Sequence, residues 1–215
     1  VAFTGNGSSV VNAVAFANDG TLTLGTSGGT QTYNGGLTTT SVGGTVTLNG
    51  TIATSNDAIV FGAVTLGSNT IVDTNATNGT GDITLAAVTG GNNTLTLTTE
   101  NNVANADITA SGAISGVTTL TLASVGGTAT LSADVDVTTF SVDNTVANVT
   151  FTGSTNVFTN AVNFQNDGTL TFGNSTSDSF TFNGGLTTSS VAGTVTLNTS
   201  ISSSNDAIVF GAVTL

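Results

Sequence analysis

The chain has 215 residues, enough for a sizeable hydrophobic core, and 38% of them are hydrophobic. It contains no Lys, Arg, His, Cys, Pro, Met or Trp, so its net charge of −12 comes from Asp and Glu alone. The missing types exclude salt bridges, disulfides, zinc sites built on His or Cys, and catalytic sets that need His or Cys. Without a basic side chain to neutralise phosphates, nucleic acid is excluded as a partner and anionic membrane surfaces are disfavoured.

Short strand signals recur along the chain, each ending in an aliphatic residue, Thr and Leu. Period two places the apolar residues on one face and the Thr residues on the other. Gly, Asn, Ser and Asp clusters between them are typical of tight turns. No segment has a sustained 3.6-residue apolar period, and the longest apolar runs, about five residues, are too short to span a bilayer. We expect an all-β chain with essentially no helix, and strand signals at 21–24, 45–48, 63–66, 82–85, 94–97, 119–122 and 128–131.

A long duplication organises the chain. Residues 34–66 recur as 183–215 with 27 identities in 33 positions at an offset of 149, and residues 1–5 and 18–25 recur at an offset of 148. We therefore expect a first long repeat unit at 1–148 and the start of a second at 149–215, continuous with the first. Repetition on this scale also indicates that the chain is part of a longer array.

Two all-β architectures fit the strand pattern. A sandwich or barrel gives no reason for long near-identical repeats, whereas a β-solenoid stacks like residues on successive rungs. The first strand signals start 24, 18 and 19 residues apart, which favours the solenoid, while the later steps of 12, 25 and 9 fit it less well. The prediction is a parallel β-helix of roughly 10 to 11 rungs of about 20 residues each.

Few residues are candidates for chemistry. Asp134 and Asp136 would share one face of a strand, as an acid–base pair, a cation site or two solvated side chains. Asn-Asp turns make weak calcium candidates of Asp19, Asp57, Asp167 and Asp206, because carboxylate and carbonyl oxygens are calcium ligands. Asn-Asp-Gly is also a favourable turn sequence, so we expect no required metal or cofactor and no catalysis.

The repeated Thr-x-Thr pairs suggest another surface. Thr21/Thr23, Thr45/Thr47, Thr94/Thr96 and Thr119/Thr121 have the local form of a flat ice-binding array on a solenoid. Thr is also an ordinary outward-facing strand residue. We expect irregular rung lengths to break the flatness of such an array.

The succession of short strand and turn signals in NDAIVFGAVTLGSNTIVDTNATNGTGDITL and NNTLTLTT resembles the repetitive regions of bacterial filamentous-haemagglutinin-like and autotransporter-type surface proteins. The resemblance covers nearly the whole chain. It implies an exported protein with right-handed parallel β-helices that acts as a stalk or adhesin at the bacterial cell surface. Enzymes of the parallel β-helix class, such as pectin lyases, carry clustered Asp with Arg or Lys, and this chain has neither base.

The prediction is therefore a structural extracellular protein: a rod-like segment of an adhesin or surface fibre, self-associating as a homo-oligomer or filament. Host or surface glycans would be bound by regions outside this chain. The alternatives are an ice-binding or glycan-binding β-helix and, least favoured, a polysaccharide-cleaving enzyme.

Overall fold

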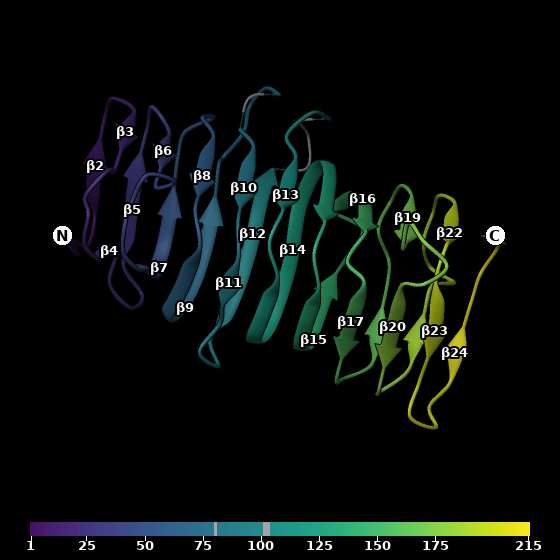
Figure 1. Cartoon of the computed structure of the whole chain (residues 1–215). Coiled ribbons are helices and arrows are strands. Elements are labelled where there is room, and N and C mark those ends of the chain that lie inside the picture. Colours follow the sequence, from purple (N-terminus) through teal and green to yellow (C-terminus); the bar gives the residue numbers. More distant parts are fainter. Residues whose placement is uncertain (80, 101–103) are drawn as a thin grey trace.

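The computed structural model describes residues 1–79, 81–100 and 104–215, and these residues form parallel strands and no helix. Figure 1 shows the chain winding from the N-terminus at one end to the C-terminus at the other, with each turn beside the last. The fold is a β-solenoid of ten turns, and each turn has three strand positions. We call these positions faces A, B and C, in chain order within a turn. The predicted parallel β-helix is thereby confirmed.

Each face is a column of strands, and most neighbours in a column pair in parallel. Face A holds β1 (Ala2–Phe3), β4 (Leu22–Leu24), the starts of β7 (Val46–Ala53) and β9 (Val64–Asp73), β11 (Val88–Thr89), the starts of β14 (Ile114–Leu131) and β15 (Val135–Val142), β17 (Thr155–Phe158), β20 (Ser179–Phe182) and β23 (Ser200–Ser202). Face B holds β2 (Ser8–Val10), β5 (Thr30–Tyr33), the ends of β7 and β9, β12 (Thr94–Glu100), the middle of β14, the end of β15, β18 (Val162–Asn163), β21 (Leu186–Thr187) and β24 (Ile208–Val209). Face C holds β3 (Val14–Ala15), β6 (Leu37–Thr38), β8 (Ile59–Phe61), β10 (Ile83–Leu85), β13 (Ile108–Ala110), the end of β14, β16 (Val146–Phe151), β19 (Leu170–Phe172), β22 (Val195–Leu197) and β25 (Val213–Thr214).

The turns differ in length while the faces stay in register. Paired residues lie 18 residues apart at Val46 and Val64 and 26 apart at Val88 and Ile114, around a typical spacing of about 22. The irregular spacing of the later strand signals also has a simple cause. The 18-residue strand β14 runs along all three faces of one turn, so signals only 9 residues apart lie on its successive faces. The right-handed sense stays a prediction.

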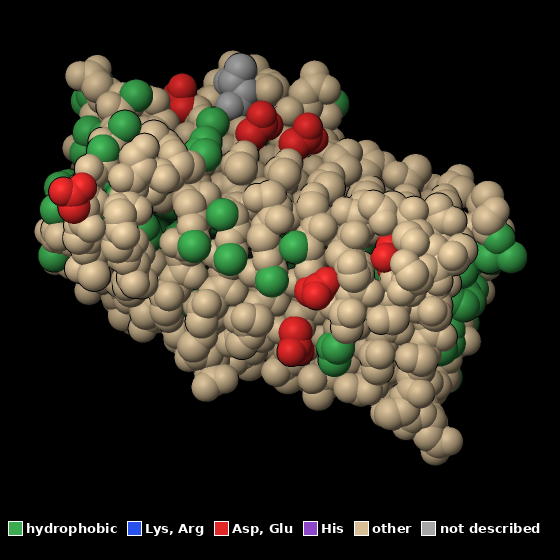
Figure 2. Space-filling view, viewed as in Figure 1, with side chains coloured by type: hydrophobic (Ala, Val, Ile, Leu, Met, Phe, Trp, Pro, Cys, Tyr) green, Lys and Arg blue, Asp and Glu red, His purple; other side chains and the backbone are tan. Residues whose placement is uncertain are grey.

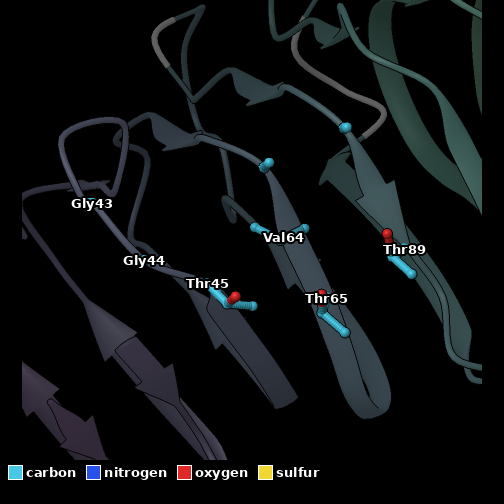
Figure 3. A pocket seen from close by; sticks show the side chains of 8 residues that line it. Gly43, Gly44, Thr45, Val64, Thr65 and Thr89 are labelled. Carbon is cyan, nitrogen blue, oxygen red and sulfur yellow. The ribbon is translucent and has the colours of Figure 1, made fainter. Parts of the chain in front are cut away.

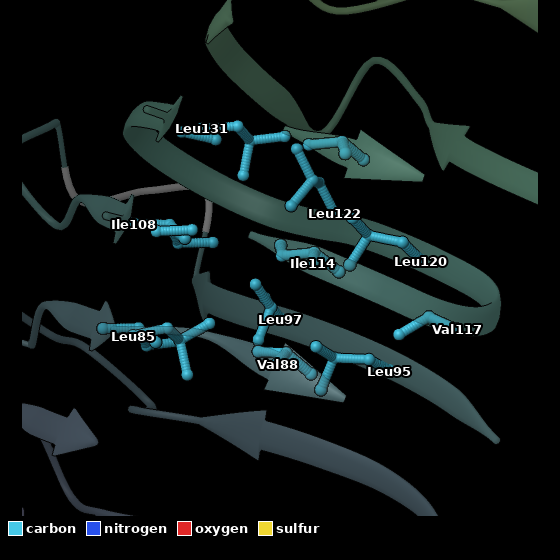
Figure 4. Close-up of a cluster of buried hydrophobic side chains, with 14 of the residues drawn as sticks. Leu85, Val88, Leu95, Leu97, Ile108, Ile114, Val117, Leu120, Leu122 and Leu131 are labelled. Atoms are coloured by element: carbon cyan, nitrogen blue, oxygen red, sulfur yellow. The ribbon is translucent and has the colours of Figure 1, made fainter. Parts of the chain in front are cut away.

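The interior is a continuous apolar column. Inward residues stack turn upon turn, as Leu22, Val46, Val64 and Val88 do on face A. Figure 4 shows the same packing in the middle turns, where Leu97 and Val88 lie between Leu85 of face C and Leu95 of face B in one apolar interior. Burying such side chains contributes about 1.5–3 kcal/mol each, so stability accumulates along the rod.

Phenylalanines fill the interior of the later turns. Phe151 stacks on Phe172 with ring centroids 5.7 Å apart, and Phe158 stacks on Phe182 at 4.8 Å. Phe158, Phe172 and Phe182 stand where the first copy has Val10, Leu24 and Tyr33. All three Phe residues are fully buried.

Buried threonines close the loops between faces B and C. Thr54, Thr74 and Thr99 follow one another at this corner on successive turns and are at most 1% exposed. Their hydroxyls donate to carbonyl oxygens of the loops that follow them, including Thr74 Oγ1 to Gly81 O at 2.6 Å and Thr99 Oγ1 to Ala106 O at 3.1 Å. These bonds tie each loop to the solenoid and satisfy buried carbonyls.

The two sequence copies do not lie on the same faces. Val46 is on face A of the third turn, and its counterpart Val195 is on face C of the ninth. Likewise Ile59 on face C corresponds to Ile208 on face B. The long repeat therefore spans six and two-thirds turns, so each copy is rotated by one face relative to the last.

Candidate functional site

The four weak calcium candidates lie far apart. Asp19, Asp167 and Asp206 are exposed and Asp57 is half-buried, each at a corner between faces. Because of the one-face rotation, Asp19 precedes face A while its counterpart Asp167 precedes face C. Within the described ranges, no three Asp, Glu, His or Cys side chains come together as a metal site would require. The expectation that no metal is required stays a prediction.

The Asn-Asp-Gly corners have turn chemistry of their own. The Asn18 side-chain amide donates to Gly20 O at 2.6 Å and Thr21 O at 3.2 Å, and Asn166 Nδ2 donates to Gly168 O and Thr169 O in the second copy. These bonds occupy carbonyl oxygens that a cation would need. Asn18 Oδ1 and Asn166 Oδ1 are buried without a hydrogen-bond partner in the described structure.

The Asp134–Asp136 pair is a structural corner followed by an outward residue. Asp134 Oδ1 accepts a hydrogen bond from Thr155 N–H of the next turn at 2.9 Å. Asp136 is exposed and pairs in register with Ser115 and Val157. Other corner residues bridge turns in the same way, as when Asn148 Oδ1 accepts from Thr169 N–H. Asp134 thus has a structural task that needs no catalytic function.

The longest regular surface feature is a threonine ladder on face C, with one threonine per turn over seven consecutive turns. The five members up to Thr171 each point outward between two buried apolar residues, and Thr196 and Thr214 continue the column in the last two turns. The residues that we call the threonine ladder are Thr84, Thr109, Thr130, Thr150, Thr171, Thr196 and Thr214. Chain steps of 18 to 25 residues between members are absorbed outside the paired strands, so the ladder keeps its register. The expectation that irregular turns break the flatness of a threonine array stays a prediction.

A parallel file of polar residues lies two positions before the threonine ladder. From the sixth to the ninth turn it consists of Thr128, Asn148, Thr169 and Thr194, which carry no charge, and the tenth turn has Ala212 at this position. Thr128 and Asn148 pair directly. Two earlier members, Asp82 and Asp107, are charged. Face C therefore becomes a neutral, two-file polar surface in its second half.

Shorter ladders occur on the other faces. On face A, Thr23, Thr47, Thr65 and Thr89 stack in register before Ser115. On face B, the predicted pairs Thr94/Thr96 and Thr119/Thr121 do stack on each other. The sequence thus predicted the pairs, but it did not show that the longest ladder lies on face C, because that ladder joins residues of both copies.

A groove of about 400 Å³ runs beside the face A ladder. Figure 3 shows Gly43 and Gly44 on one side and Thr65 and Thr89 on the next turns. A Cβ on Gly44 would lie 2.6 Å from the carbonyl carbon of Gly20, so the corner needs glycine for close packing of the turns. The lining residues include no charged or aromatic side chain. The groove is a consequence of small corner residues.

The surface has acidic groups and no basic ones. Figure 2 shows carboxylates scattered over the visible face, with no Lys, Arg or His. Tyr33 is 1% exposed, and burial raises the pKa of its hydroxyl above the usual range. This residue belongs to the core and offers no stacking platform for a glycan. Within the described residues, no helix is long and apolar enough to cross a membrane.

The chain matches no protein-family model, no curated protein and no solved structure.

Proposed function

We propose that this chain is a stiff segment of an exported structural fibre or adhesin at the bacterial cell surface. One observation carries the proposal: strand pairing continues without interruption across the boundary between the copies, from β14 to β16 and on to β19. Further copies therefore extend the rod turn by turn without a separate domain interface.

The charge distribution supports an individual rod. Lateral contact between two chains of −12 each is opposed by repulsion, and no basic side chain relieves it. Contact along the rod axis meets less opposition, because β23, β24 and β25 occupy the same three faces as β1, β2 and β3. A head-to-tail contact would continue all three columns as a filament.

Two measurements test this function. Antibodies raised against the chain are expected to label intact, unpermeabilised cells that make the protein, and labelling only after permeabilisation would contradict the proposal. Electron microscopy of the whole protein should show an unbranched rod. A globular particle would contradict the fibre, whatever the location.

A further inference from the structure

We propose that the second half of face C is an ice-binding surface, assembled across the junction of the two long repeat copies. This surface consists of the threonine ladder from Thr130 to Thr214 and its neutral neighbouring file. It is separate from the rod function, which needs only the interior and the strand pairing.

The offset between the copies creates this surface. Thr84, Thr109 and Thr130 belong to the first copy, while Thr150 and the later members belong to the second. The counterparts of Thr171 and Thr196 in the first copy are Thr23 and Thr47, which lie on face A. If the repeat spanned a whole number of turns, Thr150 and the later members would lie on face A, while Thr84, Thr109 and Thr130 would stay on face C. The rotation by one face therefore joins the two runs of threonines into one ladder.

The geometry of the face is a regular grid. Successive turns are about 4.8 Å apart, and residues two apart in a strand are about 6.6 Å apart. Thr128/Thr130, Thr169/Thr171 and Thr194/Thr196 each fill both files of one turn. Strand pairing on both sides holds Thr130, Thr171 and Thr196, so the hydroxyl and methyl groups of the ladder repeat at fixed positions, as a crystalline lattice of water requires. In the neighbouring file Thr128 pairs with Asn148, and Asn148 Oδ1 accepts from the N–H and the hydroxyl of Thr169.

The hydroxyls of the threonine ladder are available for a ligand. In the described structure their Oγ1 atoms make no side-chain hydrogen bond, whereas the corner threonines Thr74 and Thr99 use theirs internally. The six members up to Thr196 are half-buried, so each hydroxyl lies close to the sheet and does not project into solvent on a long, mobile side chain.

The chemistry favours ordered water over the alternatives. The two files carry no charge from Thr128 onward, so they do not order water around ions. No aromatic side chain lies among the outward residues of the two files to stack on a sugar ring. Ice is the ligand that a rigid, neutral grid of hydroxyl and methyl groups fits best.

The test is thermal hysteresis of the purified chain, with ice-recrystallisation inhibition as a second readout. The chain should show both, and absence of both would overturn the proposal. A variant with Thr171→Lys and Thr196→Lys should lose them. The matched control is Thr23→Lys with Thr47→Lys, which changes the counterpart residues on face A and should keep most of the effect. Equal loss in the two variants would overturn the assignment to face C.

A gain-of-function variant makes the test independent of folding defects. Asp107 is the charged residue of the neighbouring file that adjoins the neutral half, and its Oδ1 accepts from Thr128 N–H. Asp107→Asn keeps an acceptor oxygen and extends the neutral surface by the turn that carries Thr109, so hysteresis should rise, and an unchanged value would count against the proposed surface. Binding to crystalline cellulose or chitin without hysteresis would overturn ice in favour of a glycan.

Discussion

At the scale of single residues, the two copies satisfy the same backbone groups with different side chains. In the first copy, Gln31 Nε2 donates to Phe3 O and Gly5 O, and Tyr33 OH donates to Gln31 Oε1 at 3.0 Å. In the second copy, Phe180 and Phe182 stand at these positions, and the carbonyl of Gly153 accepts instead from Asn156 Nδ2 at 2.9 Å. Asn156 corresponds to Ser8. We therefore expect the three differences to act as one exchange.

Tyr33→Phe alone should destabilise the chain. The ring has room, since Phe occupies the counterpart position, but Gln31 Oε1 loses its donor in a buried site at a cost of about 1–3 kcal/mol. Thermal unfolding followed by circular dichroism should show the melting temperature falling by about 2–4 °C per kcal/mol.

Restoring the whole exchange provides the control for this prediction. The double variant Gln31→Phe with Tyr33→Phe leaves Gly5 O without the Gln31 donor, and Ser8→Asn supplies the donor used in the second copy. The triple variant should therefore melt above the double variant. If Ser8→Asn adds nothing, the three positions do not act together.

Asp73 is a half-buried carboxylate without a cation to pair with. Burial raises its pKa, and the hydrogen bond from Asn75 N–H lowers it only in part. Its contribution to stability is therefore fully present below the pKa of the unfolded carboxyl, about 3.9, and is lost as pH rises through the higher folded pKa. Asp73→Asn keeps an acceptor oxygen and should raise the melting temperature at pH 7, with the gain shrinking in acid. Asp167→Asn removes one exposed charge, and an equal gain there would show that burial is not the cause.

At the scale of strands and corners, threonines have two distinct roles. Inward corner residues such as Thr74 donate to loop carbonyls, while outward residues such as Thr84 make no side-chain hydrogen bond in the described structure. Both follow the same Thr-rich pattern in the sequence. Only the position relative to the corner separates them.

Thr74→Val should be clearly destabilising and Thr84→Val should not. Valine has nearly the same shape, so the first change mainly leaves Gly81 O without its donor in a buried site, at a cost of about 1–3 kcal/mol. Urea unfolding of both variants measures the difference. Similar midpoints would mean that the corner hydrogen bond contributes little.

Strand identity could be predicted from the sequence, while corner geometry could not. Period-two alternation placed Leu22 and Leu24 inside and Thr23 outside, as the structure has them. The sequence did not show how long each corner is, because a loop of any composition is allowed once its carbonyls are satisfied. The sequence therefore could identify threonines as strand residues, but it could not show which of them stack on one another. The ladders could be assigned only from the strand pairing in the structure.

At the scale of the whole molecule, sequence similarity does not reveal that each copy is rotated by one face relative to the last. Identical stretches suggest identical surroundings, and residues 34–66 and 183–215 do share local features, since Asn56 and Asn205 have φ of 77° and 81°. The continuous strand β7 nevertheless corresponds to the two separate strands β22 and β23. The faces of the two stretches also differ, because 149 residues divided among turns of about 22 leave two-thirds of a turn. Three copies are needed to return a surface to the same face, after 20 turns or about 96 Å.

Pyrene labels test the rotation directly, because the chain has no cysteine of its own. Thr130→Cys with Thr150→Cys places two labels on adjacent turns of face C, about 4.8 Å apart, and should give strong excimer fluorescence. Asp136→Cys with Val157→Cys should do the same on face A.

The mixed pair, Asp136→Cys with Thr150→Cys, joins different faces and should give mainly monomer emission. If the repeat spanned whole turns, Thr150 would share face A with its counterpart Ala2 and lie near Asp136, and the mixed pair would give the excimer instead. The ratio of excimer to monomer emission thus decides whether successive copies present their surfaces on one side of the rod or on all three.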